Sequence, residues 1–352
     1  MAYTDIDKPS DYFTAFKWTG NGASSRALTG VGFQGNMLWS KPNTGHNHYL
    51  VDTVRGVDNK SLIPDATTAE DTTGTHGHFD SIDADGFTGT LAGGGYNFNR
   101  DALEFIAWIW KAGTTSGIVT NGSTTITPSA YSFNQTAGFS TLAYTGNQTS
   151  GAKLAHGLGV KPDMVITKSR AGASGWGVYH KSLGATYGML LNTTAAKDDD
   201  ATAWNDVEPD TVNITLGSSI NTNKTGTCVA YAFAEKQGYS KFGSYVGNGN
   251  VSGSYIHLGF KPAFVIIKDA TSARDWVMFD NKRNISNVVN NRLFPNSTDA
   301  QNTSVDALDF LSNGFKIRST NSTVNVSGNT YIYMVFAEES FVSSSGVPAT
   351  AR

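Results

Sequence analysis

The sequence predicts an all-β fold made of three tandem β-sandwich domains of the jelly-roll type. Two observations lead to this prediction. The composition combines 38 glycines and 11% aromatic residues with only 16% charged residues, which suits short strands joined by tight turns. In addition, one sequence pattern occurs three times along the 352 residues. A flattened barrel is the alternative arrangement for short strands of this kind.

The repeated pattern centres on a glycine that is followed by an apolar strand. Residues 31–41, 158–168 and 258–268 align with one another. The second and third copies are β-branched and apolar after a Lys-Pro pair, which indicates central strands that are buried on both faces. Each copy also closes on a further apolar strand, at 105–110, 228–233 and 331–336. The aligned segments lie 100 or more residues apart, which is longer than the repeat unit of a solenoid. We therefore expect each copy to be a domain with its own core.

These anchors predict how the chain is divided. The predicted units are an N-terminal docking segment at 1–14, sandwich repeats at 15–113, 138–238 and 239–352, and a linker or added hairpin at 114–137. The join between the second and third repeats is short, so these two should pack closely. Asp85-Gly86 and Asn313-Gly314 lie at equivalent places and predict hairpin turns.

Charge and hydropathy exclude several classes of partner. The net charge is −3 and no basic run occurs, so nucleic acid is not expected as a partner. We expect no membrane insertion, because no long apolar stretch is present. The first residues do not show a basic segment followed by an apolar one, so we expect synthesis in the cytoplasm. Cys228 is the only cysteine and lies in an apolar run, which predicts a buried core residue and no disulfide.

Two His-x-His pairs in the first repeat are candidate metal sites. They consist of His46 with His48 and of His76 with His78. Residues i and i+2 of a strand share one face, so each pair could offer two imidazoles to one ion. Neither pair recurs in the other repeats, and solvent-exposed histidines are the alternative interpretation.

The acidic residues give no clear catalytic pattern. Asp80, Asp83 and Asp85 have the spacing of a calcium loop, but the equivalent turn of the third repeat has no carboxylate, which favours a structural turn. Glu235 and Glu338 could be imagined as a glycosidase pair, but they hold equivalent positions in different repeats and are better explained as strand-end charges. No nucleophile or phosphate-binding motif occurs, so we expect neither an enzyme nor a cofactor.

Four aromatic residues lie in polar surroundings outside the repeated pattern. They are Trp18, Tyr96, Tyr131 and Trp204. Exposed tryptophan and tyrosine rings stack on sugar faces or anchor protein interfaces. We therefore take these four as candidate ligand-binding residues, with a host surface glycan as the candidate ligand.

The chain resembles the repeated-domain structural proteins in the virions of marine tailed bacteriophages, including phages of cyanobacteria. The resemblance rests on residues 3–13, the Gly-Asn-Gly signal, the Gly-Phe-Lys-Pro strand and the Phe-Ala-Glu endings at 233–235 and 336–338. The first repeat departs from this pattern at 34–36. The resemblance implies a tail-fibre or tail-associated virion component for host attachment, which contacts other virion proteins and forms a homo-oligomer, with a trimer as our expectation. A capsid decoration or head-fibre protein and a carbohydrate-active depolymerase are the alternatives.

Overall fold

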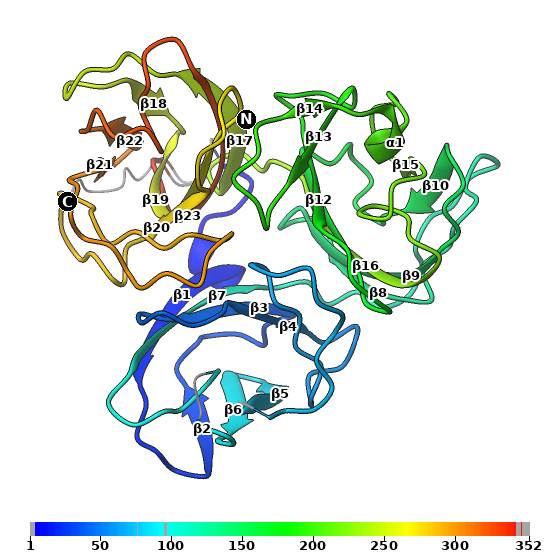
Figure 1. Ribbon diagram of the computed structural model, residues 1–352, viewed down its shortest axis with the longest axis horizontal. Helices are drawn as coiled ribbons and strands as arrows, with labels where there is room; N and C mark the ends of the chain where they lie inside the picture. Colours follow the sequence, from blue (N-terminus) through cyan, green and yellow to red (C-terminus); the bar gives the residue numbers. More distant parts are fainter. Residues whose placement is uncertain (1–3, 76, 95–96, 343–345, 347–352) are drawn as a thin grey trace.

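The structure is a computed structural model that describes residues 4–75, 77–94, 97–342 and 346. The predicted all-β class is confirmed. Among the described residues the helical elements are one 3₁₀ turn, η1 (Pro9–Asp11), and one short α-helix, α1 (Ala201–Trp204). Figure 1 shows three lobes, one for each repeat, arranged around a common centre.

The first and third repeats each pair a four-stranded sheet with a three-stranded sheet. Their four-stranded sheets have the same order, β1-β7-β3-β4 and β17-β23-β19-β20, and their three-stranded sheets are β2-β6-β5 and β18-β22-β21. The strands of the first repeat are β1 (Phe13–Thr19), β2 (Ser25–Thr29), β3 (Met37–Pro42), β4 (Tyr49–Asp52), β5 (His78–Asp83), β6 (Gly86–Thr90) and β7 (Glu104–Trp110). Those of the third are β17 (Ser240–Val246), β18 (Tyr255–His257), β19 (Phe260–Asp269), β20 (Val277–Asp280), β21 (Leu308–Leu311), β22 (Gly314–Ile317) and β23 (Thr330–Ser340).

The second repeat is a variation on the same plan. Its main sheet has seven strands in the order β14-β13-β12-β11-β16-β9-β8, and its second sheet is the pair β10-β15. The strands are β8 (Ala130–Asn134), β9 (Phe139–Gly146), β10 (Ala152–Ala155), β11 (Met164–Ser169), β12 (Trp176–His180), β13 (Tyr187–Leu190), β14 (Asp198–Asp199), β15 (Asn213–Leu216) and β16 (Gly226–Phe233). β8 lies within 114–137 and forms an antiparallel hairpin with β9, so this segment adds an edge strand to the sheet.

The closing strands β7, β16 and β23 have two apolar faces. Alternate side chains on a strand point to opposite sides. In each strand, one face packs within its own repeat. The residues of this face are Phe105, Ala107 and Ile109 in β7, Cys228, Ala230 and Ala232 in β16, and Tyr331, Tyr333 and Val335 in β23. The opposite face of each strand belongs to a fourth cluster at the centre of the molecule. The residues of this face are Ile106, Trp108 and Trp110 in β7, Val229, Tyr231 and Phe233 in β16, and Ile332, Met334 and Phe336 in β23. Each repeat thus has its own apolar cluster, and all three share the central cluster.

Three equivalent rings meet at the middle of the central cluster. The ring centroids of Trp110 and Phe233 are 6.1 Å apart, those of Trp110 and Phe336 are 5.6 Å apart, and those of Phe233 and Phe336 are 6.1 Å apart. All three pairs meet edge to face, at 64°, 76° and 63°. Because each ring comes from a different closing strand, the repeats are related by an approximate threefold axis through this point.

The N-terminal segment is part of this arrangement from Thr4 onward. Ile6 lies in the central cluster and is 3% exposed. Thr4 is also buried, and its hydroxyl donates to the carbonyl oxygen of Gln237 at 3.0 Å. The described part of residues 1–14, which we expect to dock the chain onto the particle, thus packs into the junction between repeats.

Candidate functional site

The repeats are joined by three sets of buried or part-buried hydrogen bonds between equivalent places of the three repeats. In the first set, one aromatic ring N–H of each repeat donates to a backbone carbonyl of a neighbouring repeat. The bonds run from His48 Nε2 to Phe294 O (2.9 Å), from Trp176 Nε1 to Ile63 O (3.0 Å) and from Trp276 Nε1 to Leu190 O (3.0 Å). His48 occupies the place of a tryptophan in the other repeats and makes the same bond.

A buried lysine of each repeat makes the second set. The lysine side chains donate from Lys41 Nζ to Thr298 O (3.4 Å), from Lys168 Nζ to Thr67 O (3.0 Å) and from Lys268 Nζ to Thr194 O (3.0 Å). Burial lowers the pKa of each of these lysines to about 8, so the ammonium groups remain charged at neutral pH. Because they bond to backbone carbonyls of two repeats, they are structural links between them.

The third set joins Asp52, His180 and Asp280, which hold equivalent places in the three repeats, to the closing strand of another repeat, although the donor is not on the same side in all three bonds. It comprises Asp52 accepting from Tyr231 OH (2.7 Å), His180 Nε2 donating to Tyr333 O (3.0 Å) and Asp280 accepting from Trp108 Nε1 (3.3 Å). An ion pair strengthens the junction of the first and second repeats, because Glu70 accepts from both Arg55 and Arg170. Together the three sets bond every repeat to both of its neighbours and close the ring.

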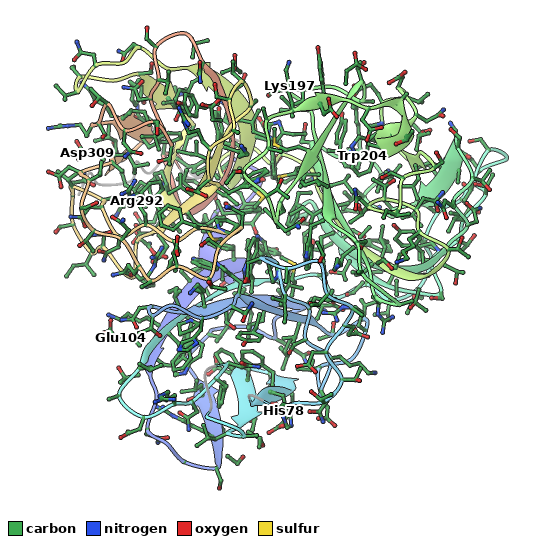
Figure 2. The ribbon with its side chains drawn as sticks, viewed as in Figure 1. His78, Glu104, Lys197, Trp204, Arg292 and Asp309 are labelled. Atoms are coloured by element: carbon green, nitrogen blue, oxygen red, sulfur yellow. The ribbon has the colours of Figure 1, made fainter. Side chains whose placement is uncertain are left out.

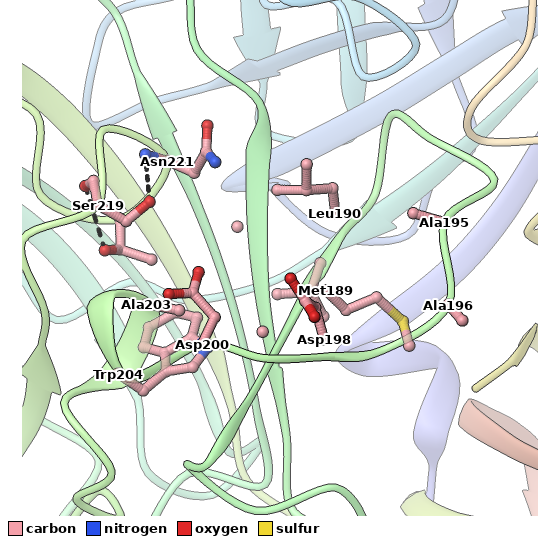
Figure 3. Close-up of a pocket in the computed structure, with 14 residues that line it drawn as sticks. Met189, Leu190, Ala195, Ala196, Asp198, Asp200, Ala203, Trp204, Ser219 and Asn221 are labelled. Carbon is pink, nitrogen blue, oxygen red and sulfur yellow. Dashed lines mark hydrogen bonds between the residues drawn. The ribbon is translucent and has the colours of Figure 1, made fainter. Parts of the chain in front are cut away.

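The second repeat carries a pocket of about 280 Å³ beside its junction with the third. Figure 3 shows Asp198, Asp200 and Asn221 around this hollow, with Met189 and Leu190 on its apolar side. Asp200 caps α1 by accepting from the backbone N–H of Thr202 at 2.9 Å, and the Asn221 side-chain oxygen accepts from the Gly175 N–H at 2.6 Å. These polar groups shape the walls of the pocket, and Asp198 stands exposed at its rim.

The aromatic candidates are less accessible than we expected. Trp18 and Trp204 are 5% and 1% exposed, so the expectation that they are surface rings is wrong for both. Trp18 faces the core of the first repeat and donates from Nε1 to Phe98 O at 2.9 Å. Trp204 packs edge to face on Tyr179 and lines the pocket from within the core. Tyr131 is half-buried, and its hydroxyl accepts from the N–H of Ile118. Tyr96 lies outside the described residues.

The first histidine pair does not form a metal site. His46 and His48 precede β4 and are not in a strand. His48 is fully buried with both ring nitrogens engaged, since Nδ1 accepts from Trp39 Nε1 at 3.0 Å while Nε2 donates to a carbonyl. Burial lowers the pKa of His48 well below its ordinary value, which keeps this histidine neutral.

His78, from the second histidine pair, lies in an acidic cluster. His76 is outside the described residues. His78 Nε2 is 2.9 Å from an oxygen of Asp80 and 3.5 Å from an oxygen of Asp58. Figure 2 labels His78 in the outer part of the first repeat, away from the central cluster. The i, i+2 spacing of His78 and Asp80 was visible in the sequence, but Asp58 comes from a distant loop and the sequence pattern gave no signal for it.

The remaining acidic candidates have structural partners. Asp85 accepts from the backbone N–H groups of Gly30 and Gly32, as a turn-forming residue does. Glu235 pairs with Lys181, and Glu338 pairs with Lys261, each within its own repeat. Asp83 accepts from Ser81 and Thr88. Cys228 is buried in the core of the second repeat, as expected.

Comparison with known proteins identifies the family. The family described as "Domain of unknown function (DUF7483)" matches residues 8–340. The chain belongs to the DUF7483 family. The DUF7483 match begins next to η1 and ends with β23, so a single family match spans all three repeats and the three junctions between them. No curated protein and no solved structure matches this DUF7483 chain. Within the described residues, none of its helices has the length and apolar character needed to cross a membrane.

Proposed function

We propose that this chain is a structural component of a phage virion, in a tail fibre or another tail-associated part that serves host attachment. The observation that supports this proposal best is the closed ring of three repeats around one central cluster. Each of the three junctions contains a buried hydrogen bond, and we infer that the described part of the chain behaves as one rigid block. Rigidity of this kind suits a part that transmits force and presents binding surfaces at fixed positions.

The distribution of buried polar groups supports the same role. Lys41, Lys168 and Lys268 are charged groups of a kind rarely found buried. Each donates to backbone carbonyls across a junction, so these groups hold the repeats together. The chain acts by binding other virion proteins and the host surface, for which a glycan is the candidate ligand. The pocket beside Asp198 offers carboxylate oxygens to the hydroxyl groups of such a ligand.

Immunogold labelling of intact phage particles tests the proposal. An antibody raised against the folded chain should label the tail. Label confined to the capsid would overturn the tail position and favour a decoration or head-fibre protein, which quantitative mass spectrometry would find in many more copies per particle. Absence of the chain from purified particles would overturn the virion role. Release of reducing ends from host polysaccharide by the pure protein would favour the depolymerase.

A further inference from the structure

We propose that Asp58, His78 and Asp80 bind one divalent transition-metal ion in the first repeat. Their ligand atoms, one from each residue, all lie within 4.8 Å of one another. An ion bound at about 2.0–2.2 Å to three ligands in tetrahedral geometry would separate the ligand atoms by about 3.3 Å. The distances from His78 Nε2, 2.9 Å to Asp80 and 3.5 Å to Asp58, are close to this spacing, so small side-chain movements would complete the site.

The fold directs these side chains toward one point. His78 and Asp80 lie two residues apart near the start of β5, and the register with β6 shifts between Phe79 and Ser81, where Asp80 lies. Such bulges re-aim side chains. Thr90 donates to the Oδ2 atom of Asp80 at 2.9 Å, which leaves Oδ1 directed at His78. A fixed outer partner of this kind is typical of metal-ligating carboxylates.

Two buried atoms behind His78 provide independent support. His78 Nδ1 and Asn59 Oδ1 are both buried and have no hydrogen-bond partner among the described residues. Both border Gly74, where an added Cβ would lie 2.7 Å from the first atom and 2.1 Å from the second. A metal ion on Nε2 would place the imidazole proton on Nδ1, and metal-bound histidines donate that N–H to an acceptor. Asn59 Oδ1 is an acceptor near that nitrogen but is not hydrogen-bonded to it, so metal binding together with a small movement of the Asn59 side chain, whose amide donates to Asp58 Oδ1 at 2.9 Å, would satisfy both atoms.

The donor set indicates which ions the site prefers. One imidazole nitrogen and two carboxylates suit Zn²⁺, Mn²⁺, Fe²⁺ or Co²⁺, whereas Ca²⁺ prefers six to eight oxygen ligands. The two carboxylates also balance the charge of a divalent ion. The side chains of Asp58, Asp80 and His78 are 71%, 31% and 17% exposed, so water can occupy the remaining coordination positions. A bound ion would tie the loop that carries Asp58 to the edge strand β5.

The alternative explanation is that His78 contacts both carboxylates without any metal. Isothermal titration of the tag-free, EDTA-treated full chain with ZnCl₂ at about pH 7 separates the two, because metal binding needs the neutral imidazole. We expect one Zn²⁺ per chain, and one Co²⁺ per chain with visible absorption bands of a bound ion. His78→Asn and Asp80→Asn should each weaken Zn²⁺ binding about tenfold or more.

The control variant is His257→Asn, which removes an exposed histidine of the third repeat and should leave Zn²⁺ binding unchanged. Near-ultraviolet circular dichroism checks that each variant remains folded. The proposal is overturned if the folded wild-type chain takes up no stoichiometric Zn²⁺. It is equally overturned if His78→Asn binds Zn²⁺ as tightly as wild type does.

Discussion

The indole Nε1 of Trp176 donates to the carbonyl oxygen of Ile63 at 3.0 Å, across the junction of the second and first repeats. A second bond from the same atom reaches Ala66 O at 3.1 Å. Trp276 and His48 make the corresponding bond at the other two junctions. His48 replaces a tryptophan and still donates to the equivalent carbonyl, so the hydrogen bond is kept at this position although the aromatic residue differs.

Trp176→Phe should therefore destabilise the whole chain. The change removes the indole donor from two half-buried carbonyls, of which Ile63 O keeps a bond from the Ala66 N–H, and we expect a cost of about 1 kcal/mol in the free energy of unfolding beyond the loss of ring volume. Urea unfolding followed by fluorescence measures the loss. The matched control is Trp204→Phe, because the Nε1 of Trp204 is buried with no partner among the described residues. An equal loss of stability in the two variants would contradict the role given to the Trp176 bonds.

Glu70→Gln should weaken the junction of the first and second repeats. Glu70 is 8% exposed at its side chain and pairs with Arg55 and Arg170, so the variant removes the carboxylate partner of Arg170 across the junction and leaves Arg55 paired with Asp52 alone. We expect a loss of about 2–4 kcal/mol, as for other broken buried ion pairs. Glu104→Gln serves as the control, because its pair with Lys17 is exposed and should contribute less than about 1 kcal/mol. If both variants unfold at the same urea concentration, the buried network does not stabilise the junction.

The chain should lose stability in mild acid. Burial lowers the pKa of His156 and of His180 to about 4, against an ordinary value of 6.5. As the pH falls below 6.5, the unfolded chain takes up protons before the folded chain does, so the free energy of unfolding decreases down to about pH 4. This linkage amounts to roughly 3 kcal/mol per histidine over the full range.

Urea midpoints measured between about pH 7 and pH 4.5 test this linkage. His180→Gln should have a flatter pH dependence than wild type, because one of the titrating groups is gone. The difference between the two proteins isolates His180 from the carboxylates that titrate in the same range. Parallel curves for wild type and His180→Gln would show that His180 is not the buried neutral histidine described above.

Gly314→Ala should disrupt the smaller sheet of the third repeat. A Cβ at Gly314 would lie 2.1 Å from the carbonyl oxygen of Ile256 on the neighbouring strand β18, so the strands would have to separate. We expect a loss of more than about 2 kcal/mol in the free energy of unfolding. Gly122→Ala is the control, because no atom lies within 4 Å of the added Cβ there. Wild-type stability in Gly314→Ala would contradict the close approach of the two strands.

The sequence was sufficient to predict the strands but not the ring. β11 and β19 are buried at every residue, as their β-branched pattern predicted. The same pattern indicates that both faces of these strands are covered, but it does not show what covers the second face. In the structure, that face packs into the central cluster formed by all three repeats. The lysine that ends each aligned segment was visible as a repeat. Its role could not be inferred, because the carbonyls that accept from Lys41, Lys168 and Lys268 come from other repeats.

The candidate residues show a similar limit. Trp18 and Trp204 have polar neighbours in the sequence, but neighbours do not determine the direction of a side chain, and both rings point into a core. The His-x-His spacing at 76 and 78 drew attention to the correct strand. The carboxylates that the structure brings to His78 are those of Asp80, at the i+2 position, and of Asp58, whose approach depends on how the loop after β4 folds back.

Hydrogen exchange measured by mass spectrometry in increasing urea tests the central claim most directly. If the three repeats form one closed ring, the backbone amides of β7, β16 and β23 should exchange with the same free energy of opening, and Trp176→Phe should lower that free energy equally in all three strands. Three different free energies, with only the second repeat affected by Trp176→Phe, would show that the repeats unfold independently and would contradict the closed ring.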